Sequence, residues 1–151
     1  MKILYTTGSS NESSVLLHLI NCDDVFIPSL SSRVDVKSYA TRIVEKAQRY
    51  EAWSNDELIG LVAVYCNSSD HLCAYITNVS VLPSFAGTGI ASKLMQYCKD
   101  ELSAIGFKSI ELEVSCKNKI AIALYKKNGF NIVEKNSTVQ KMKINLTEAF
   151  K

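Results

Sequence analysis

The 151-residue sequence lacks the long hydrophobic runs that membrane proteins and secreted precursors require. Its longest near-continuous apolar run, Leu58 to Cys66, has the length of a strand and is far too short to span a bilayer. The N-terminus has no apolar stretch long enough for a signal peptide, which predicts a cytoplasmic protein without a membrane partner. With 6 glycines, 2 prolines and 47% hydrophobic residues, the composition excludes a disordered or collagen-like chain.

Cysteine and histidine are also scarce. The five cysteines form an odd number without CxxC spacing, which predicts reduced thiols and neither a disulfide framework nor a zinc site. Only His18 and His71 could supply imidazoles, and nothing in their spacing brings them together, so we expect no metal. His18 lies in the apolar stretch VLLHLI, which indicates a partly buried helix residue.

Net charge gives little guidance, because 17 basic and 15 acidic residues leave only +2. This value does not indicate nucleic acid as a partner. The basic residues are nevertheless concentrated: between Lys117 and Lys143 there are seven lysines and one acid, Glu134. The segment fits either a solvated surface or one that attracts a phosphorylated ligand.

The periodicity of apolar residues predicts one mixed α/β layered domain over residues 1–151, in the order β-α-α-β-β-β-α-β-α-β-β. No linker or internal repeat interrupts it. The expected strands are 2–7, 50–53, 58–66, 72–82, 109–114, 130–135 and 138–146. The first expected helix follows an N-cap at Ser10 or Asn11 and runs to about residue 22. The others are about 36–48, 89–105 and 118–128, the last with Asn118 as its N-cap.

Residues 79–91, VSVLPSFAGTGIA, predict a strand that ends at Pro83, a loop with Gly87 and Gly89, and the start of a helix. Glycines allow a sharp turn and a close approach of the backbone to a ligand. The N–H groups of a helix's first turn are free, and the helix dipole adds positive charge there. Such a segment suits a pyrophosphate, although by itself it also fits a structural turn.

A second segment, residues 112–130, predicts a strand followed by a helix. Asn118, Ala121 and Tyr125 fall at i, i+3 and i+7, so they share one helix stripe. A small residue between two hydrogen-bonding residues leaves a groove for a slender ligand. The alternative is a capped helix with a half-buried tyrosine.

Together the two segments resemble the acetyl-CoA-binding core of the GNAT superfamily of N-acetyltransferases. VLPSFAGTGIA is similar to its pyrophosphate loop, usually V-x-P-x-x-[QR]-G-x-G-[IV]-[GA], and LEVSCKNKIAIALYKKNGF contains its N-x-x-A-x-x-x-Y-x-x-x-GF pattern. The resemblance implies a mostly antiparallel sheet of about six to seven strands flanked by about four helices. Ala86 stands where Gln or Arg is usual, which implies weaker or differently supported binding of CoA.

The resemblance implies transfer of acetyl from acetyl-CoA to a primary amine of a small molecule or a peptide N-terminus, by direct attack in a ternary complex. Tyr125 would protonate the departing thiolate. Glu113 matches the glutamate that is the general base in ribosomal-protein alanine N-acetyltransferases, with a structural role for Glu113 or another base (Asp70, His71 or a held water) as alternatives. The residues expected to bind the cofactor are Val79, Ser80, Val81, Ala86, Gly87, Thr88, Gly89, Ile90, Ala91, Asn118, Ala121, Leu124, Tyr125 and Lys127.

Two other functions remain open. One is a non-catalytic acyl-CoA-binding module of the same fold. The other is a dinucleotide-binding oxidoreductase, which is disfavoured because Ser92 replaces the third glycine of its motif and three strands precede the loop.

The acceptor is expected to contact Phe26 to Arg33, Tyr39, Trp53 and Asp70. The stretch FIPSLSSRVD is similar to one in small acetyltransferases, some encoded near surface-polysaccharide genes, which points to an amino sugar as one candidate. A monomer and a homodimer are both compatible with the sequence.

Overall fold

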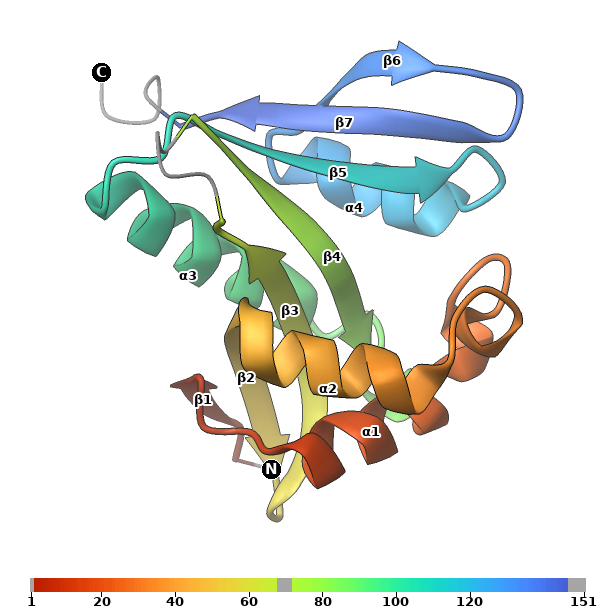
Figure 1. Ribbon diagram of the computed structural model, residues 1–151, viewed down its shortest axis with the longest axis vertical. Helices are drawn as coiled ribbons and strands as arrows, with labels where there is room; N and C mark the ends of the chain where they lie inside the picture. Colours follow the sequence, from red (N-terminus) through yellow and green to blue (C-terminus); the bar gives the residue numbers. More distant parts are fainter. Residues whose placement is uncertain (1, 68–71, 147–151) are drawn as a thin grey trace.

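The computed structural model describes residues 2–67 and 72–146, which form a seven-stranded sheet with four α-helices (Figure 1). The helices are α1 (Glu12–Asn21), α2 (Val36–Lys46), α3 (Ile90–Ala104) and α4 (Lys119–Lys127). The strands are β1 (Leu4–Thr7), β2 (Ala47–Ser54), β3 (Glu57–Tyr65), β4 (Cys73–Val81), β5 (Ser109–Ser115), β6 (Asn131–Lys135) and β7 (Val139–Asn145). Three short 3-10 helices are η1 (Asp23–Val25), η2 (Leu30–Ser32) and η3 (Pro83–Phe85). The sheet order is β1-β2-β3-β4-β5-β7-β6, and the predicted fold class and element order are confirmed.

The predicted boundary between the second helix and the second strand is wrong. The second helix was expected to reach residue 48, but it ends at Lys46, and Ala47 and Gln48 open β2. These two residues pair with Tyr65 and Val64 of β3, so strand pairing overrides their local preference for helix.

Polar side chains begin two of the helices as expected. The side chain of Asn11 accepts a hydrogen bond from the Ser14 backbone N–H at 2.8 Å, and the Ser14 hydroxyl accepts one from the Asn11 N–H. This capping box starts α1. Asn118 caps α4 with its Oδ1, which accepts a hydrogen bond from the backbone N–H of Ala121 at 3.2 Å.

Helices cover both faces of the sheet (Figure 1). Helices α1 and α2 pack on one face, while α3 and α4 pack on the other. A glycine in β3, Gly60, lets α3 approach closely, because a Cβ there would lie 2.9 Å from Ile90 Cγ2 and 3.3 Å from Leu94 Cδ1. The beginning of α3 is therefore held close against the sheet.

A bulge at Thr77 interrupts the pairing of β4 with β3. Asn78 pairs with Ala63, but the next β3 residue, Val64, pairs with Ile76. The extra residue reverses the alternation of side chains along β4. Ile76 packs in the core that α3 covers, whereas Asn78 lies opposite Ala63 in the core beneath α1 and α2.

Tyr39 of α2 holds this bulge. Its hydroxyl donates a hydrogen bond to the Thr77 carbonyl oxygen at 2.6 Å and lies 2.8 Å from Thr77 Oγ1.

Strands β4 and β5 are parallel, and they pair only where Cys73–Tyr75 lie beside Ser109–Glu111. Beyond these residues the two strands diverge, as Figure 1 shows.

A buried charge joins the N-terminal segments to the sheet. Glu51 of β2 is fully buried and accepts hydrogen bonds from Thr6 Oγ1, from Ser9 and Ser10, and from Arg49 Nε at 3.3 Å. Arg49 donates in addition to three backbone carbonyls. Burial acts to raise the pKa of Glu51, but the hydrogen bonds outweigh it and hold the pKa below its ordinary value of 4.5.

We expect Glu51→Gln to lower the free energy of unfolding by about 3 kcal/mol, because it leaves the buried Arg49 without its countercharge. Urea unfolding at pH 7 measures this loss. Since the folded-state pKa is depressed, the contribution of Glu51 is present at neutral pH and is lost as the pH falls through that pKa. Glu45→Gln, on the exposed face of α2, serves as control and should change stability by less than about 0.5 kcal/mol. Equal stability of the two variants would contradict the prediction.

Candidate active site

A cavity of about 1340 Å³ opens where β4 and β5 separate. It brings together every residue that the sequence predicted for catalysis or cofactor binding: Glu113, Val79, Ser80, Val81, Ala86, Gly87, Thr88, Gly89, Ile90, Ala91, Asn118, Ala121, Leu124, Tyr125 and Lys127. Its other walls come from the segment between α1 and α2 and from the β6–β7 hairpin. These residues come from four separate parts of the chain, so the cavity depends on the whole fold.

The glycine loop forms one end of the cavity. Gly87 and Gly89 have φ values of +76° and +85°, a region that L side chains rarely adopt. Gly89 is the N-cap of α3 and makes no side-chain cap, so the N–H groups of the first turn are left for a ligand. Ala86 lines the cavity here and contributes only a methyl group.

The edge of β4 forms a second wall. Along Val79–Val81, β4 pairs with β3 but not with β5. The backbone groups on the β5 side therefore have no strand partner within the part of the chain that the structure describes. An extended ligand with amide groups could take the place of the missing strand.

Helix α4 supplies the opposite wall. Asn118 uses its Oδ1 as the helix cap, which leaves its Nδ2 as a donor. Asn118, Ala121 and Tyr125 all line the cavity.

Tyr125 is a buried phenol at the cavity wall. Its side chain is 8% exposed, its ring packs edge-to-face on Phe130, and burial raises its pKa above the usual value of 10. Its hydroxyl makes no hydrogen bond to a residue within 2–67 or 72–146. A phenol that stays protonated and has a free hydroxyl can give a proton to a leaving group.

Glu113 projects from β5 toward β4. Its Oε1 lies 3.4 Å from the hydroxyl of Tyr75, the last residue of β4 that pairs with β5. Burial, and then the charge of Glu113, raise the pKa of Tyr75 to about 12. Glu111, two residues earlier, does not line the cavity.

The predictions for the acceptor side are partly met. Phe26, Arg33 and Tyr39 line the cavity. Trp53 does not, because it lies in β2 and donates through Nε1 to Thr6 Oγ1 of β1 at 2.7 Å. Asp70, like the alternative base His71, lies outside the described residues.

Sequence reasoning missed three polar residues of β4 at the cavity, Tyr75, Thr77 and Asn78. Regular alternation along the predicted strand 72–82 puts Tyr75 and Asn78 on opposite faces. The bulge at Thr77 lets both reach the cavity, and no sequence signal marked that bulge.

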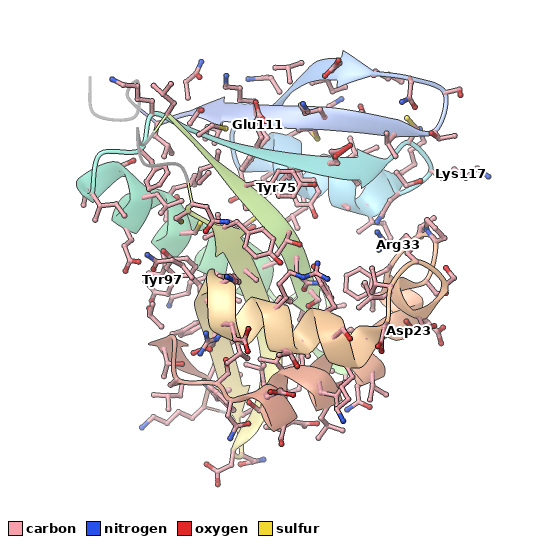
Figure 2. All side chains as sticks on the ribbon, viewed as in Figure 1. Asp23, Arg33, Tyr75, Tyr97, Glu111 and Lys117 are labelled. Atoms are coloured by element: carbon pink, nitrogen blue, oxygen red, sulfur yellow. The ribbon has the colours of Figure 1, made fainter. Side chains whose placement is uncertain are left out.

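The basic segment contributes less to the cavity than its lysine count indicated. Lys117 and Lys127 line the cavity, whereas Lys141 pairs with Glu134 at 3.5 Å. Figure 2 shows Lys117 and Arg33 on opposite sides of the opening.

None of the helices within residues 2–67 and 72–146 has the length and hydropathy to cross a membrane. Within the same ranges, no three His, Cys, Asp or Glu side chains gather as metal ligands would.

The sheet is mixed, one pair of parallel strands separates along its length, and a glycine loop lies where they separate. This combination is typical of acetyltransferase folds. The chain belongs to the acetyltransferase (GNAT) family, whose model matches residues 17–130. It is 34% identical over 85 residues to N-alpha-acetyltransferase 30 of Schizosaccharomyces pombe, covering 54% of this chain and 55% of that protein. It is 40% identical over 58 residues to [Ribosomal protein bS18]-alanine N-acetyltransferase of Salmonella typhimurium, covering 38% and 39%. The matches thus span about half, or less, of these relatives.

Solved structures show the same fold. The ribosomal-protein-S18-alanine N-acetyltransferase of Escherichia coli superposes with a TM-score of 0.74 at 19% identity, over 95% of this chain and 94% of that one. PaiA N-acetyltransferase from Thermoplasma acidophilum, in complex with coenzyme A, gives 0.74 at 13% identity over 96% and 99%.

We expect Gly89→Ala to weaken the binding of CoA about tenfold, because a side chain at this positive φ strains the turn that presents the N–H groups of α3. Isothermal titration calorimetry with CoA measures the change. Gly8→Ala is a matched control, since Gly8 also has a positive φ (+67°) and open space around it but lies outside the cavity. CoA affinities of Gly89→Ala and Gly8→Ala that agree within twofold would rule out the role of the loop.

Proposed function

We propose that the protein is an acetyl-CoA-dependent N-acetyltransferase that acts on a primary amine of a small molecule or a peptide N-terminus, with residues 1–151 as one acetyltransferase domain. The observation that carries this proposal is the separation of β4 from β5. It gathers a helix N-terminus, an open strand edge, a phenol and a carboxylate around one cavity.

The donor groups of the cavity fit acetyl-CoA, which supplies the activated acetyl thioester. The N–H groups from Gly87 to Ala91 suit a pyrophosphate at the positive end of the α3 dipole. The β4 edge along Val79–Val81 suits the amides of the pantetheine arm, and Asn118 Nδ2 is a further donor on the opposite wall. Lys127 adds a positive charge at the same cavity.

Glu113 and Tyr125 divide the proton transfers between them. An amine must lose a proton to attack a thioester, and Glu113 is the carboxylate placed to take it. Tyr125 gives a proton to the thiolate that leaves, and its raised pKa keeps that proton available at neutral pH. Cys116 does not line the cavity, which supports direct attack over a covalent enzyme intermediate.

The curated relatives favour an α-amino group over an amino sugar as the acceptor. One relative is named as an N-alpha-acetyltransferase, and the other is named for an alanine of a ribosomal protein. We therefore place a peptide N-terminus first among the acceptors.

The proposal is tested by incubating the purified protein with acetyl-CoA and each of four amines: an alanine-led peptide, glucosamine, spermidine and a free amino acid. Mass spectrometry detects the acetylated product, and thiol release gives the rate. Acetylation of at least one amine is expected. Binding of CoA without any transfer would favour a non-catalytic acyl-CoA-binding module, and binding of NAD without CoA would favour an oxidoreductase.

We expect Tyr125→Phe to lower kcat about 100-fold, because the departing thiolate loses its proton donor. The KM for acetyl-CoA should stay within about twofold, since the ring that packs on Phe130 is kept. Tyr97→Phe, on the exposed face of α3 and outside the cavity, is the control. An unchanged kcat would remove Tyr125 from the mechanism.

Glu113→Gln is expected to lower kcat/KM by about 100-fold or more at pH 7, because an amide cannot accept the proton of the amine. Glu111→Gln is the matched control, since Glu111 lies on the same strand but not at the cavity. Initial rates over a range of acceptor concentrations measure both variants. Equal rates would show that Glu113 is only part of the polar face of β5.

A further inference from the structure

Two arginines, Arg33 and Arg42, bring positive charge to the acceptor side of the cavity. Arg33 lies on the segment between α1 and α2, at the opening (Figure 2), and Arg42 lies on α2. Both side chains line the cavity and are exposed, so a ligand can reach them. The ion pairs found within residues 2–67 and 72–146 join other residues, so neither arginine has a carboxylate partner in those ranges. A guanidinium group stays charged in proteins, and this side of the cavity therefore carries two fixed positive charges.

Most N–H groups of these two guanidinium groups have no acceptor among the described residues. Arg33 donates through Nε to the Pro28 carbonyl oxygen at 3.2 Å, and its terminal nitrogens make no hydrogen bond within residues 2–67 and 72–146. Arg42 donates to no residue of the same ranges, and its guanidinium carbon lies 5.9 Å from the centre of the Tyr39 ring. These contacts restrain both groups at the wall of the cavity. The N–H pairs that suit a carboxylate or a phosphate remain available.

Tyr39 is close to both arginines. Its ring is in contact with Arg42. Burial raises the pKa of the Tyr39 hydroxyl, and the positive charge of Arg33 acts against that rise, so Arg33 also lies near this phenol. The arginines therefore form one positively charged region beside Tyr39 and not two separate surface charges.

The carboxylate that we propose as general base lies further along β4. Thr77, which accepts the hydrogen bond of Tyr39, is two residues after Tyr75. The Tyr75 hydroxyl lies 3.4 Å from Glu113 Oε1, and Tyr39, Tyr75 and Glu113 all line the cavity. An acceptor that lies along this wall therefore meets a carboxylate at one end and guanidinium groups at the other.

The other charges at the cavity do not neutralise the two arginines. Lys117 and Lys127 are also basic, and the acidic residues that line the described cavity are Asp24 and Glu113. Asp24 is exposed on η1 and forms no ion pair within residues 2–67 and 72–146. The pyrophosphate of the cofactor is proposed at the start of α3, which packs on the opposite face of the sheet from α1 and α2. An anion at the arginines would therefore belong to the acceptor.

We propose that Arg33 and Arg42 bind an anionic group, a carboxylate or a phosphate, that the acceptor carries near its reactive amine. This inference rests on the proposed acetyltransferase function. The two guanidinium groups determine specificity, while Glu113 takes the proton of the amine at the other end. The class of acceptor is thus an amine with an acid on the same molecule, such as a peptide with an acidic side chain close to its N-terminus. A polyamine, whose other groups are cations, is disfavoured.

The preference for an anion is measured with two pairs of amines that differ in one charged group. One pair consists of peptide amides that begin with alanine followed by aspartate or by asparagine, and the other consists of glucosamine 6-phosphate and glucosamine. We expect the wild-type kcat/KM to be at least about tenfold higher for the anionic member of one pair or both. The preferred pair shows whether the anion belongs to a peptide or to a sugar. Added NaCl should reduce the difference, because salt screens exposed charges.

Arg33→Gln and Arg42→Gln each remove one guanidinium group. Either change should reduce the preference at least about threefold, and the double variant should abolish it. Lys37→Gln is the matched control, because Lys37 is an exposed cation of α2 that does not line the cavity. The same preference in the double variant and in Lys37→Gln would overturn the proposal. A higher KM for acetyl-CoA with an unchanged preference would assign the arginines to the cofactor and overturn it as well.

The outcomes separate this inference from the proposed function. Transfer by the wild-type protein with equal kcat/KM values within both pairs overturns the inference alone. If the wild-type protein acetylates neither these acceptors nor any amine of the four-member panel, the proposed function fails and this inference fails with it.

Discussion

The bulge at Thr77 is the constraint on which the rest of the structure depends. A regular β4 would keep Asn78 on the same face as Ile76, inside the core that α3 covers. The extra residue instead turns Asn78 toward α1 and α2. It lies two positions after Tyr75, the last residue of β4 that pairs with β5. A strand that bulges also bends and twists more strongly, which draws β4 away from β5. Tyr39 stabilises this irregular backbone by bonding to the carbonyl of Thr77.

The other walls of the cavity need that bend but are positioned by separate contacts. Close packing of α3 over Gly60 sets the height of the glycine loop above the sheet. Lys99 of α3 donates to the carbonyl of Asn128 at 2.9 Å, and Asn128 donates to Ser92 Oγ at 3.1 Å, so the end of α4 is tied to α3. The two ends of the cavity, the loop before α3 and the phenol on α4, are therefore fixed relative to each other.

The sequence predicts the parts of the cavity whose geometry is local. Residues 87–89 and 118–125 each lie within one turn or one helix, where spacing alone determines which groups share a surface. His18 and Asn78 could not be placed in this way. The partners of His18 are 40 and 62 positions away in the chain. The face on which Asn78 lies is reversed by a bulge, and no glycine or proline in the sequence marks the position of that bulge. The element order was predictable for the same reason as the local motifs, while the end of the second helix depended on pairing with β3.

The buried Glu51 connects stability to the geometry of the cavity. It accepts hydrogen bonds from Ser9 and Ser10, immediately before the capping box that begins α1. The start of that helix is therefore fixed to β2, and two turns further on the same helix carries His18. A hydrogen bond of 2.8 Å between His18 and Ser80 tolerates only a small shift of α1 along the sheet. Glu51, which does not line the cavity, thus helps to hold His18 against Ser80, a residue of β4 that does line it.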